Sequence, residues 1–160
     1  MTLLAPLSPL PRVSSPFGVP RGATLHNGTD WPAPAGTPLH AMSDGVVEFR
    51  LAGGNSGNAV GVRSSDGRTL WSLAHMQDVF VGVGQRVRRG EVIGTVGFTG
   101  HVIPAGPAGA HVHVRVERDG QLLDPEKAIR GIVVLDLVLL GVTTWGLYEL
   151  YKRSPWRRPL

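Results

Sequence analysis

The sequence contains no cysteine, and only 6% of its residues are aromatic. Without cysteine the chain forms no disulfide and offers no thiolate to a metal, so a metal ion would have to be bound by His, Asp or Glu. Glycine and proline are abundant instead, with 22 and 13 residues among 160. This composition favours short strands joined by many turns over a bundle of helices.

The body of the chain also lacks a strong excess of positive charge. Residues 1–131 carry twelve Lys or Arg against ten Asp or Glu, out of totals of 16 and 12 for the whole chain. Domains that bind nucleic acid usually have a clustered basic surface. We therefore expect no nucleic-acid partner.

The first residues lack the features of a secretory signal peptide. "MTLLAPLSPLPRVSSPFG" has no basic stretch ahead of an apolar one and no clear cleavage site, and it contains four prolines. We interpret 1–11 as an extended N-terminal lead-in. One folded domain is then expected over 12–130.

Strand and turn signals fill most of that domain, and helical periodicity is missing from it. Strands are predicted in 44–50, 86–97 and 111–125, and 58–75 reads as a hairpin with Asp66-Gly67 near its tip. The expected fold class is mainly β, with an antiparallel β-sheet.

An apolar segment follows at the C-terminus. In 132–151, fourteen of twenty residues are apolar or aromatic. A helix of this length would measure roughly 30 Å, enough to cross a bilayer. We predict one transmembrane helix over 131–151 and a basic tail over 152–160, which the positive-inside rule places in the cytoplasm. Asp136 opposes the span, and the alternative is a terminal helix packed on the body or in an oligomer.

Histidines carry the functional signal. In "AHVHVRV" a strand would place His111 and His113 on one face and the valines on the other. Upstream, "HNGTD" places His26 four residues before Asp30. A catalytic zinc ion takes three protein ligands and leaves a position for water. His26 and Asp30 would supply two ligands, and one histidine of the pair would supply the third.

The span from Arg12 to Pro125 resembles the lysostaphin-like zinc endopeptidases, which cut peptidoglycan peptides. The resemblance rests on "RVSSPFG", "HNGTDWPAPAGTPLHAMSDGVV", "SLAHM", "VGVGQRVRRGEVIGTVGFTG", "AHVHVRV" and "LLDP". It implies a β-sheet with a narrow active-site groove and one Zn²⁺ bound by His26, Asp30 and His113. It also implies that His75 and His111 are the catalytic histidines, without saying which is the base. The bond cut, a glycine bridge or a D-alanine cross-link, stays open.

The sequence departs from the family pattern at three motif positions. Leu73 stands where the family usually has Tyr, Val114 where it usually has Phe, and Arg115 where it usually has Glu. The loop over 101–109 also looks longer than usual. His40 and His101 lie outside the pattern: His40 is expected to be an ordinary strand or surface residue, and His101 a plain surface residue, with contact to substrate as the alternative.

Together the two halves predict a membrane-anchored peptidoglycan peptidase whose partners are the cell wall and a lipid membrane. A missing signal peptide would leave the body of a tail-anchored protein in the cytoplasm. One setting that removes this conflict is a bacteriophage particle containing a membrane, where the enzyme would open the wall during infection beside other virion proteins. The alternative function is an inactive wall-binding or structural virion membrane protein with a peptidase-like fold.

Overall fold

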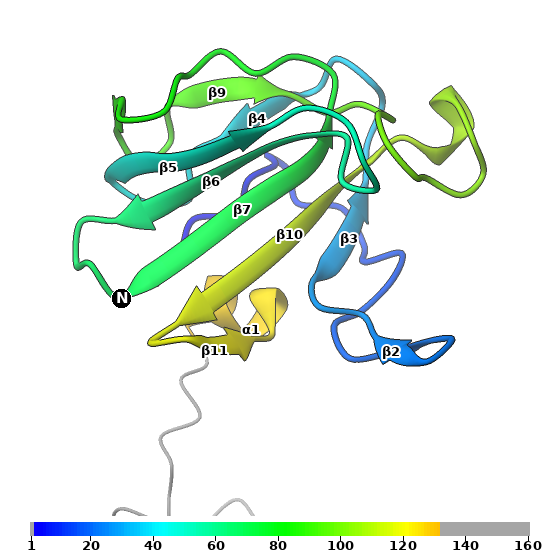
Figure 1. Ribbon diagram of the computed structural model, residues 1–160, viewed down its shortest axis with the longest axis horizontal. Coiled ribbons are helices and arrows are strands. Elements are labelled where there is room, and N and C mark those ends of the chain that lie inside the picture. Colours follow the sequence, from blue (N-terminus) through cyan, green and yellow to red (C-terminus); the bar gives the residue numbers. More distant parts are fainter. Residues whose placement is uncertain (1, 132–160) are drawn as a thin grey trace, which may run out of the picture.

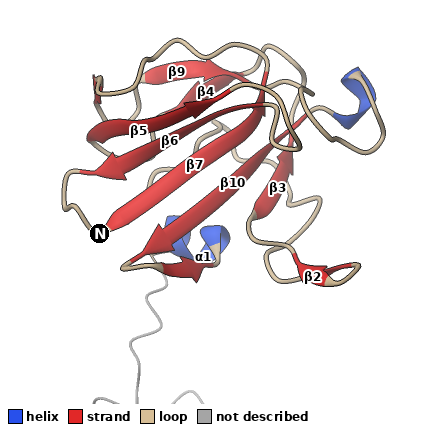
Figure 2. Ribbon diagram, in the orientation of Figure 1, coloured by secondary structure: helices blue, strands red, loops and turns tan. Residues whose placement is uncertain are grey.

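The computed structural model of the chain describes residues 2–131. The regular structure of these residues consists mainly of β-strands, which are joined by turns and loops, as Figure 2 shows. The elements in chain order are β1 (Pro20–Arg21), β2 (Thr24–Leu25), β3 (Thr29–Pro32), β4 (Pro38–His40), β5 (Gly45–Leu51), β6 (Asn58–Ser64), β7 (Thr69–Met76), β8 (Arg86–Val87), β9 (Val92–Thr95), a 3₁₀ turn (Pro107–Gly109), β10 (His111–Arg118), β11 (Gln121–Leu123) and α1 (Pro125–Arg130). The prediction of a mainly β, antiparallel fold is confirmed.

The main sheet has the strand order β11-β10-β7-β6-β5-β8, and every pairing in it is antiparallel. Strand β10 is long enough to pair with two elements along one edge: β3 pairs with its first half and β11 with its last. Figure 1 shows this division, with β3 beside one end of β10 and β11 near the other. The edge shared with β3 carries the functional site.

Alternation along the strands decides which side chains form the core. In β10, Val112, Val114 and Val116 are fully buried, while His111 and His113 are half-buried on the opposite face. The predicted separation of valines and histidines is thus confirmed. The strand is anchored on its apolar face and presents its histidines on the other.

The N-terminal segment packs into the core, which the sequence did not predict. Leu3 and Leu7 are 3% and 2% exposed. The segment bonds to the body through Leu4 N–H to Met42 O and His40 N–H to Pro6 O. Figure 1 shows this segment, in dark blue, behind the strands of the sheet. Residues 6–9 form bends, and the segment interpreted as a lead-in belongs to the folded body.

The described part of the chain ends in a short capped helix. Asp124 caps the N-terminus of α1 by accepting a hydrogen bond from Glu126 N–H, and Gly131 ends it with a left-handed backbone at φ 67°. Within 2–131, no helix has the length and apolar character needed to cross a membrane. The predicted span over 131–151 and the tail over 152–160 lie outside the described residues, except for Gly131 itself.

Candidate metal centre and catalytic cavity

Pairing between β3 and β10 brings the two histidine motifs together. Asp30 lies directly opposite His113 in the register of this antiparallel pair. Residues facing each other across a pair share a side of the sheet, so their side chains meet. Residues 83 positions apart in the chain are thereby placed in contact.

Three side chains converge on one point. His113 Nδ1 lies 2.8 Å from Asp30 Oδ1, His26 Nε2 lies 3.3 Å from the same oxygen, and the two histidine nitrogens are 3.1 Å apart. Each residue offers one ligand atom to this cluster. We call His26, Asp30 and His113 the metal cluster.

The donor set of the metal cluster fits a zinc ion. Bonds of about 2.0–2.2 Å to nitrogen and oxygen place neighbouring ligand atoms of a tetrahedral site about 3.3–3.5 Å apart, close to the distances above. His26 Nδ1 donates to the carbonyl of Pro16 at 2.8 Å, which leaves Nε2 with a free lone pair facing the cluster. Burial lowers the pKa of His26, outweighing the Pro16 carbonyl and the charge of Asp30, so the ring is neutral and able to bind a metal.

Asp30 is ionised throughout the physiological range. Burial by itself would raise the pKa of its carboxyl group, but the hydrogen bond with His113 and the electrostatic interactions with the His113, His26 and His111 rings outweigh burial and lower the pKa to about 2. A carboxylate that is charged at all working pH values is a constant ligand for a cation.

Gly28 allows the two strands to approach this closely. A Cβ atom at this position would lie 2.3 Å from Val114 O and 2.6 Å from His113 Cε1. Both distances are far below van der Waals contact, so any side chain at residue 28 would displace the His113 ring. The glycine of "HNGTD" is therefore part of how the cluster is built.

His75 reaches the site because β7 is irregular. Leu73 is buried in the core, and strict alternation would send His75 to the same face. A register shift between β6 and β7, together with a left-handed backbone at His75 (φ 62°), turns the ring toward the cavity instead. A strained backbone of this kind at a polar residue is typical of functional sites.

His75 and His111 face each other with 4.6 Å between their ring centroids. His75 Nδ1 donates to Thr99 O at 2.9 Å, and His111 Nδ1 donates to Gly109 O at 2.7 Å. Because carbonyls only accept, each neutral ring keeps an unprotonated Nε2. His111 Nε2 lies 3.8 Å from Asp30 Oδ1. Burial lowers the pKa of His75 to about 4, so this ring is neutral at pH 7.

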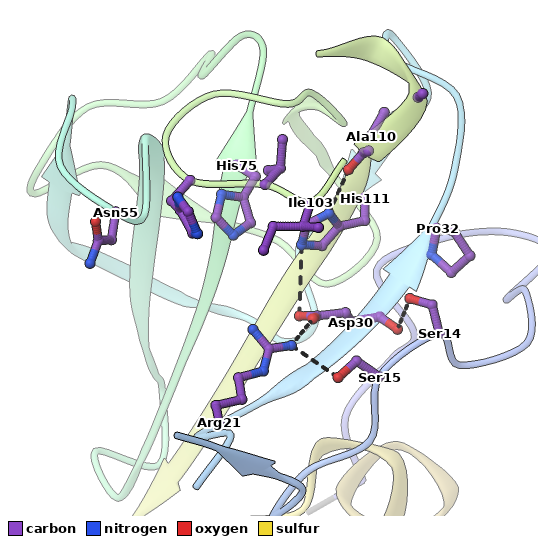
Figure 3. A pocket seen from close by; sticks show the side chains of 14 residues that line it. Ser14, Ser15, Arg21, Asp30, Pro32, Asn55, His75, Ile103, Ala110 and His111 are labelled. Carbon is purple, nitrogen blue, oxygen red and sulfur yellow. Dashed lines mark hydrogen bonds and ion pairs between the residues drawn. The ribbon is translucent and has the colours of Figure 1, made fainter. Parts of the chain in front are cut away.

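An open cavity of about 770 Å³ lies over these residues, with Asp30, His75 and His111 in its lining. Figure 3 shows Asp30 on β3 and His111 on β10 facing each other, with His75 beside His111. The lining is partly polar, with residues such as Ser14, Ser15 and Arg21, and partly apolar, with Val102, Ile103 and Ala108. The cavity places a peptide-sized space next to the metal cluster.

Two further histidines were predicted to lie outside the chemistry. His40 Nδ1 bonds to Gly90 O at 2.9 Å and is not part of the cavity lining. His101 is exposed and is one of the residues that line the cavity. Its surface position is as expected from the sequence, and contact with substrate stays a prediction.

Arg21 is a component of the site that sequence reasoning missed. Its Nη2 donates to Asp30 Oδ2 at 2.6 Å and to Ser15 Oγ at 2.9 Å (Figure 3). The guanidinium thus holds the carboxylate oxygen that faces away from His26 and His113. A single arginine on a two-residue strand has no motif or periodicity, so no sequence signal would have found it.

Comparisons with known proteins agree with the fold and the residue pattern. The profile described as Peptidase family M23 matches residues 24–125. The DD-carboxypeptidase/endopeptidase Mpg of Neisseria meningitidis is 41% identical over 120 residues, which cover 71% of this chain and 26% of that protein. The peptidoglycan DD-endopeptidase ShyC of Vibrio cholerae is 42% identical over 88 residues, which cover 55% of this chain and 19% of that protein.

The fold is lysostaphin-like. The catalytic domain of the antimicrobial peptidase lysostaphin from Staphylococcus simulans superimposes with a TM-score of 0.63 at 25% identity, covering 74% of this chain and 92% of that domain. The chain spans about a quarter or less of the length of the two relatives above. The family match and the metal cluster together support zinc as the cofactor.

Proposed function

Because the chain belongs to Peptidase family M23, we propose that it is a zinc-dependent endopeptidase that hydrolyses peptide cross-links of bacterial peptidoglycan. The observation that carries this proposal is the metal cluster with two further histidines beside it, all around one open cavity. Both relatives described above are named for cleavage of DD bonds, and the name of one includes peptidoglycan. These names support the choice of substrate.

We assign zinc binding to His26, Asp30 and His113. A zinc ion bound there would act as a Lewis acid and would lower the pKa of the water bound to it to about 7. His26 is fixed for this role by Pro16, and Asp30 by Arg21. Hydrogen bonds of this kind hold ligands in position and fix which nitrogen binds the metal.

We assign proton transfer and oxyanion binding to His75 and His111. Each has its Nδ1 proton engaged by a backbone carbonyl, so its Nε2 is available to accept a proton from the attacking water. A histidine protonated in this way can donate to the leaving amine or to the developing oxyanion. The two roles are split between His75 and His111, and the assignment of each stays open.

The proposed setting of the enzyme rests on the composition of its C-terminal residues. We propose that 131–151 anchor the chain in a membrane and that 152–160 form a cytoplasmic basic tail. The apolar composition of the segment and the four positive charges after it support this proposal. A membrane-containing bacteriophage particle, in which the enzyme opens the host wall during infection, is the location proposed for the chain.

Hydrolysis of purified peptidoglycan by the zinc-loaded full chain in detergent tests the proposed function. New amino termini and new reducing sugars are counted for the wild type, for His113→Ala and for the control variant His40→Ala. We expect the wild type and His40→Ala to release amino termini but no reducing sugars, and His113→Ala to lose both zinc and hydrolysis. Stoichiometric zinc with no hydrolysis of several wall types would contradict the proposal and favour a wall-binding or structural virion protein.

A further inference from the structure

Arg21 has hydrogen-bond donors that the protein does not use. A guanidinium has five N–H groups arranged as a planar fork. Both hydrogen bonds of Arg21 leave from Nη2, to Ser15 Oγ and Asp30 Oδ2. Among residues 2–131 no hydrogen bond engages its Nε or Nη1. The side chain is 49% exposed and lines the cavity, so these donors are open to a ligand.

The charge of the cavity favours an anionic ligand. Asp30 is the one acidic residue in the lining, and Arg21 already neutralises it. A bound zinc ion would add two positive charges. A cavity with this balance attracts an anionic substrate group and disfavours a cationic one.

We propose that Arg21 binds a free carboxylate on the substrate residue whose nitrogen is released by hydrolysis. This inference rests on the proposed endopeptidase function. In such a residue the carboxylate carbon is two bonds from the scissile nitrogen, a separation of about 2.5 Å. The guanidinium lies beside the metal cluster, because its Nη2 contacts the second oxygen of the Asp30 carboxylate at 2.6 Å. A guanidinium and a carboxylate can also form a bidentate pair with two parallel hydrogen bonds.

Apolar residues of the lining complete the selection. Ile103 is 81% exposed although it is a large aliphatic residue, and it is one of the residues that line the cavity (Figure 3). An exposed isoleucine above a catalytic site offers contact to a small apolar side chain such as a methyl group. The substrate class is therefore a peptide bond between an alanine-like residue and a residue bearing a free carboxylate. An internal glycine bridge has no carboxylate at this position.

The test uses the zinc-loaded full chain in detergent and two synthetic peptides. The peptides are identical except that the amine-side residue carries a free carboxylate in one and a carboxamide in the other. The variants are Arg21→Gln, Arg21→Lys and the control Arg86→Gln, whose exposed side chain lies outside this cavity. The value of kcat/KM is measured for each pair, and zinc affinity is measured separately by competition with a chelator.

We expect the wild type and Arg86→Gln to prefer the carboxylate peptide when zinc is saturating. Arg21→Gln should lose about 10- to 100-fold more in kcat/KM on the carboxylate peptide than on the carboxamide peptide. Arg21→Lys should recover part of this difference. Zinc affinity should fall in Arg21→Gln because Arg21 also holds Asp30, so both peptides are compared at saturating zinc. An equal loss on both peptides under that condition would show that Arg21 only positions Asp30 and would overturn the inference. Equal hydrolysis of both peptides by the wild type would overturn it too, while leaving the proposed function intact. If the zinc-loaded wild type cleaves neither peptide and no wall preparation, the proposed function itself fails, and the inference fails with it.

Discussion

The two carboxylate oxygens of Asp30 make different contacts at the site. Oδ1 lies within 3.3 Å of both His26 and His113, while Oδ2 is held by Arg21. Because the arginine occupies one oxygen, the carboxylate offers the other to a metal as a single, oriented ligand. The sequence predicted the residue types of the metal cluster, since His and Asp at that spacing suit zinc. It did not predict Arg21, Gly28 or the carbonyls that orient the histidines, because these contacts come from parts of the chain with no shared pattern.

Gly28→Ala is expected to weaken zinc binding strongly, by about tenfold or more, because the new Cβ would force His113 away from His26 and Asp30. Chelator competition on the full chain measures this affinity. Gly82→Ala is the matched control, since a Cβ at that position meets nothing within 4 Å and its backbone is not left-handed. Equal zinc affinity in the two variants would contradict the packing described for the site.

His75 is expected to make the stability of the metal-free protein depend on pH. Its folded pKa of about 4 lies below its unfolded value of 6.5, so between these values the unfolded chain binds a proton that the folded chain does not. The contribution of His75 to the free energy of unfolding should therefore fall as the pH drops from about 6.5 to about 4, and level off below that. Asp30, with its pKa lowered from 3.8 to about 2, should make the free energy of unfolding fall further below about pH 4.

Urea unfolding of zinc-free protein across this pH range tests the prediction. In His75→Gln the fall should be smaller than in the wild type, because the other titrating groups are common to both proteins. Identical pH profiles for the two proteins would show that His75 is not held neutral by burial.

At the scale of the elements, the strands with regular alternation were the most predictable. The hairpin over 58–75 appears as β6 and β7, and the valine and histidine faces of β10 are as expected. The bulge that turns His75 into the cavity was not predictable, because sequence alternation alone places it in the core. The N-terminal segment was also missed as part of the body, since isolated leucines among prolines have no period that indicates burial.

Leu7→Ala is expected to lower the free energy of unfolding by about 2–5 kcal/mol, because Leu7 is 2% exposed and its removal leaves a cavity in the core. Leu25→Ala is the control, since Leu25 is 66% exposed, and it should change stability by about 0.5 kcal/mol or less. Urea unfolding of both variants measures the difference. A neutral Leu7→Ala would mean that the N-terminal segment is detached from the body in solution.

For the whole molecule, the site depends on bringing three distant parts of the chain to one edge of the sheet. His26 and Asp30 come from the segment leading into β3, His75 from the end of β7, and His111 and His113 from the start of β10. These five side chains come together only because the strands pair in a particular register. The register is set in the folded sheet and cannot be read from the spacing of residues in the sequence. The resemblance to a known family supplied this arrangement at the sequence level, where spacing alone left the third ligand open.

The proposed anchor makes a prediction for the whole chain. Full-length protein should remain with membranes after carbonate extraction, and a chain ending at Gly131 should be released, because the apolar stretch begins at residue 132. Sedimentation of membranes from expressing cells, followed by detection of both chains, measures the partition. Release of the full-length chain by carbonate would contradict a membrane span.

The central claim is that His26, Asp30 and His113 hold one zinc ion. Anomalous diffraction from crystals of the zinc-loaded protein, recorded on both sides of the zinc absorption edge, tests it most directly. We expect a single strong anomalous difference peak about 2.0–2.2 Å from His26 Nε2, Asp30 Oδ1 and His113 Nδ1. A peak elsewhere in the molecule, or no peak in protein that contains zinc by elemental analysis, would contradict it.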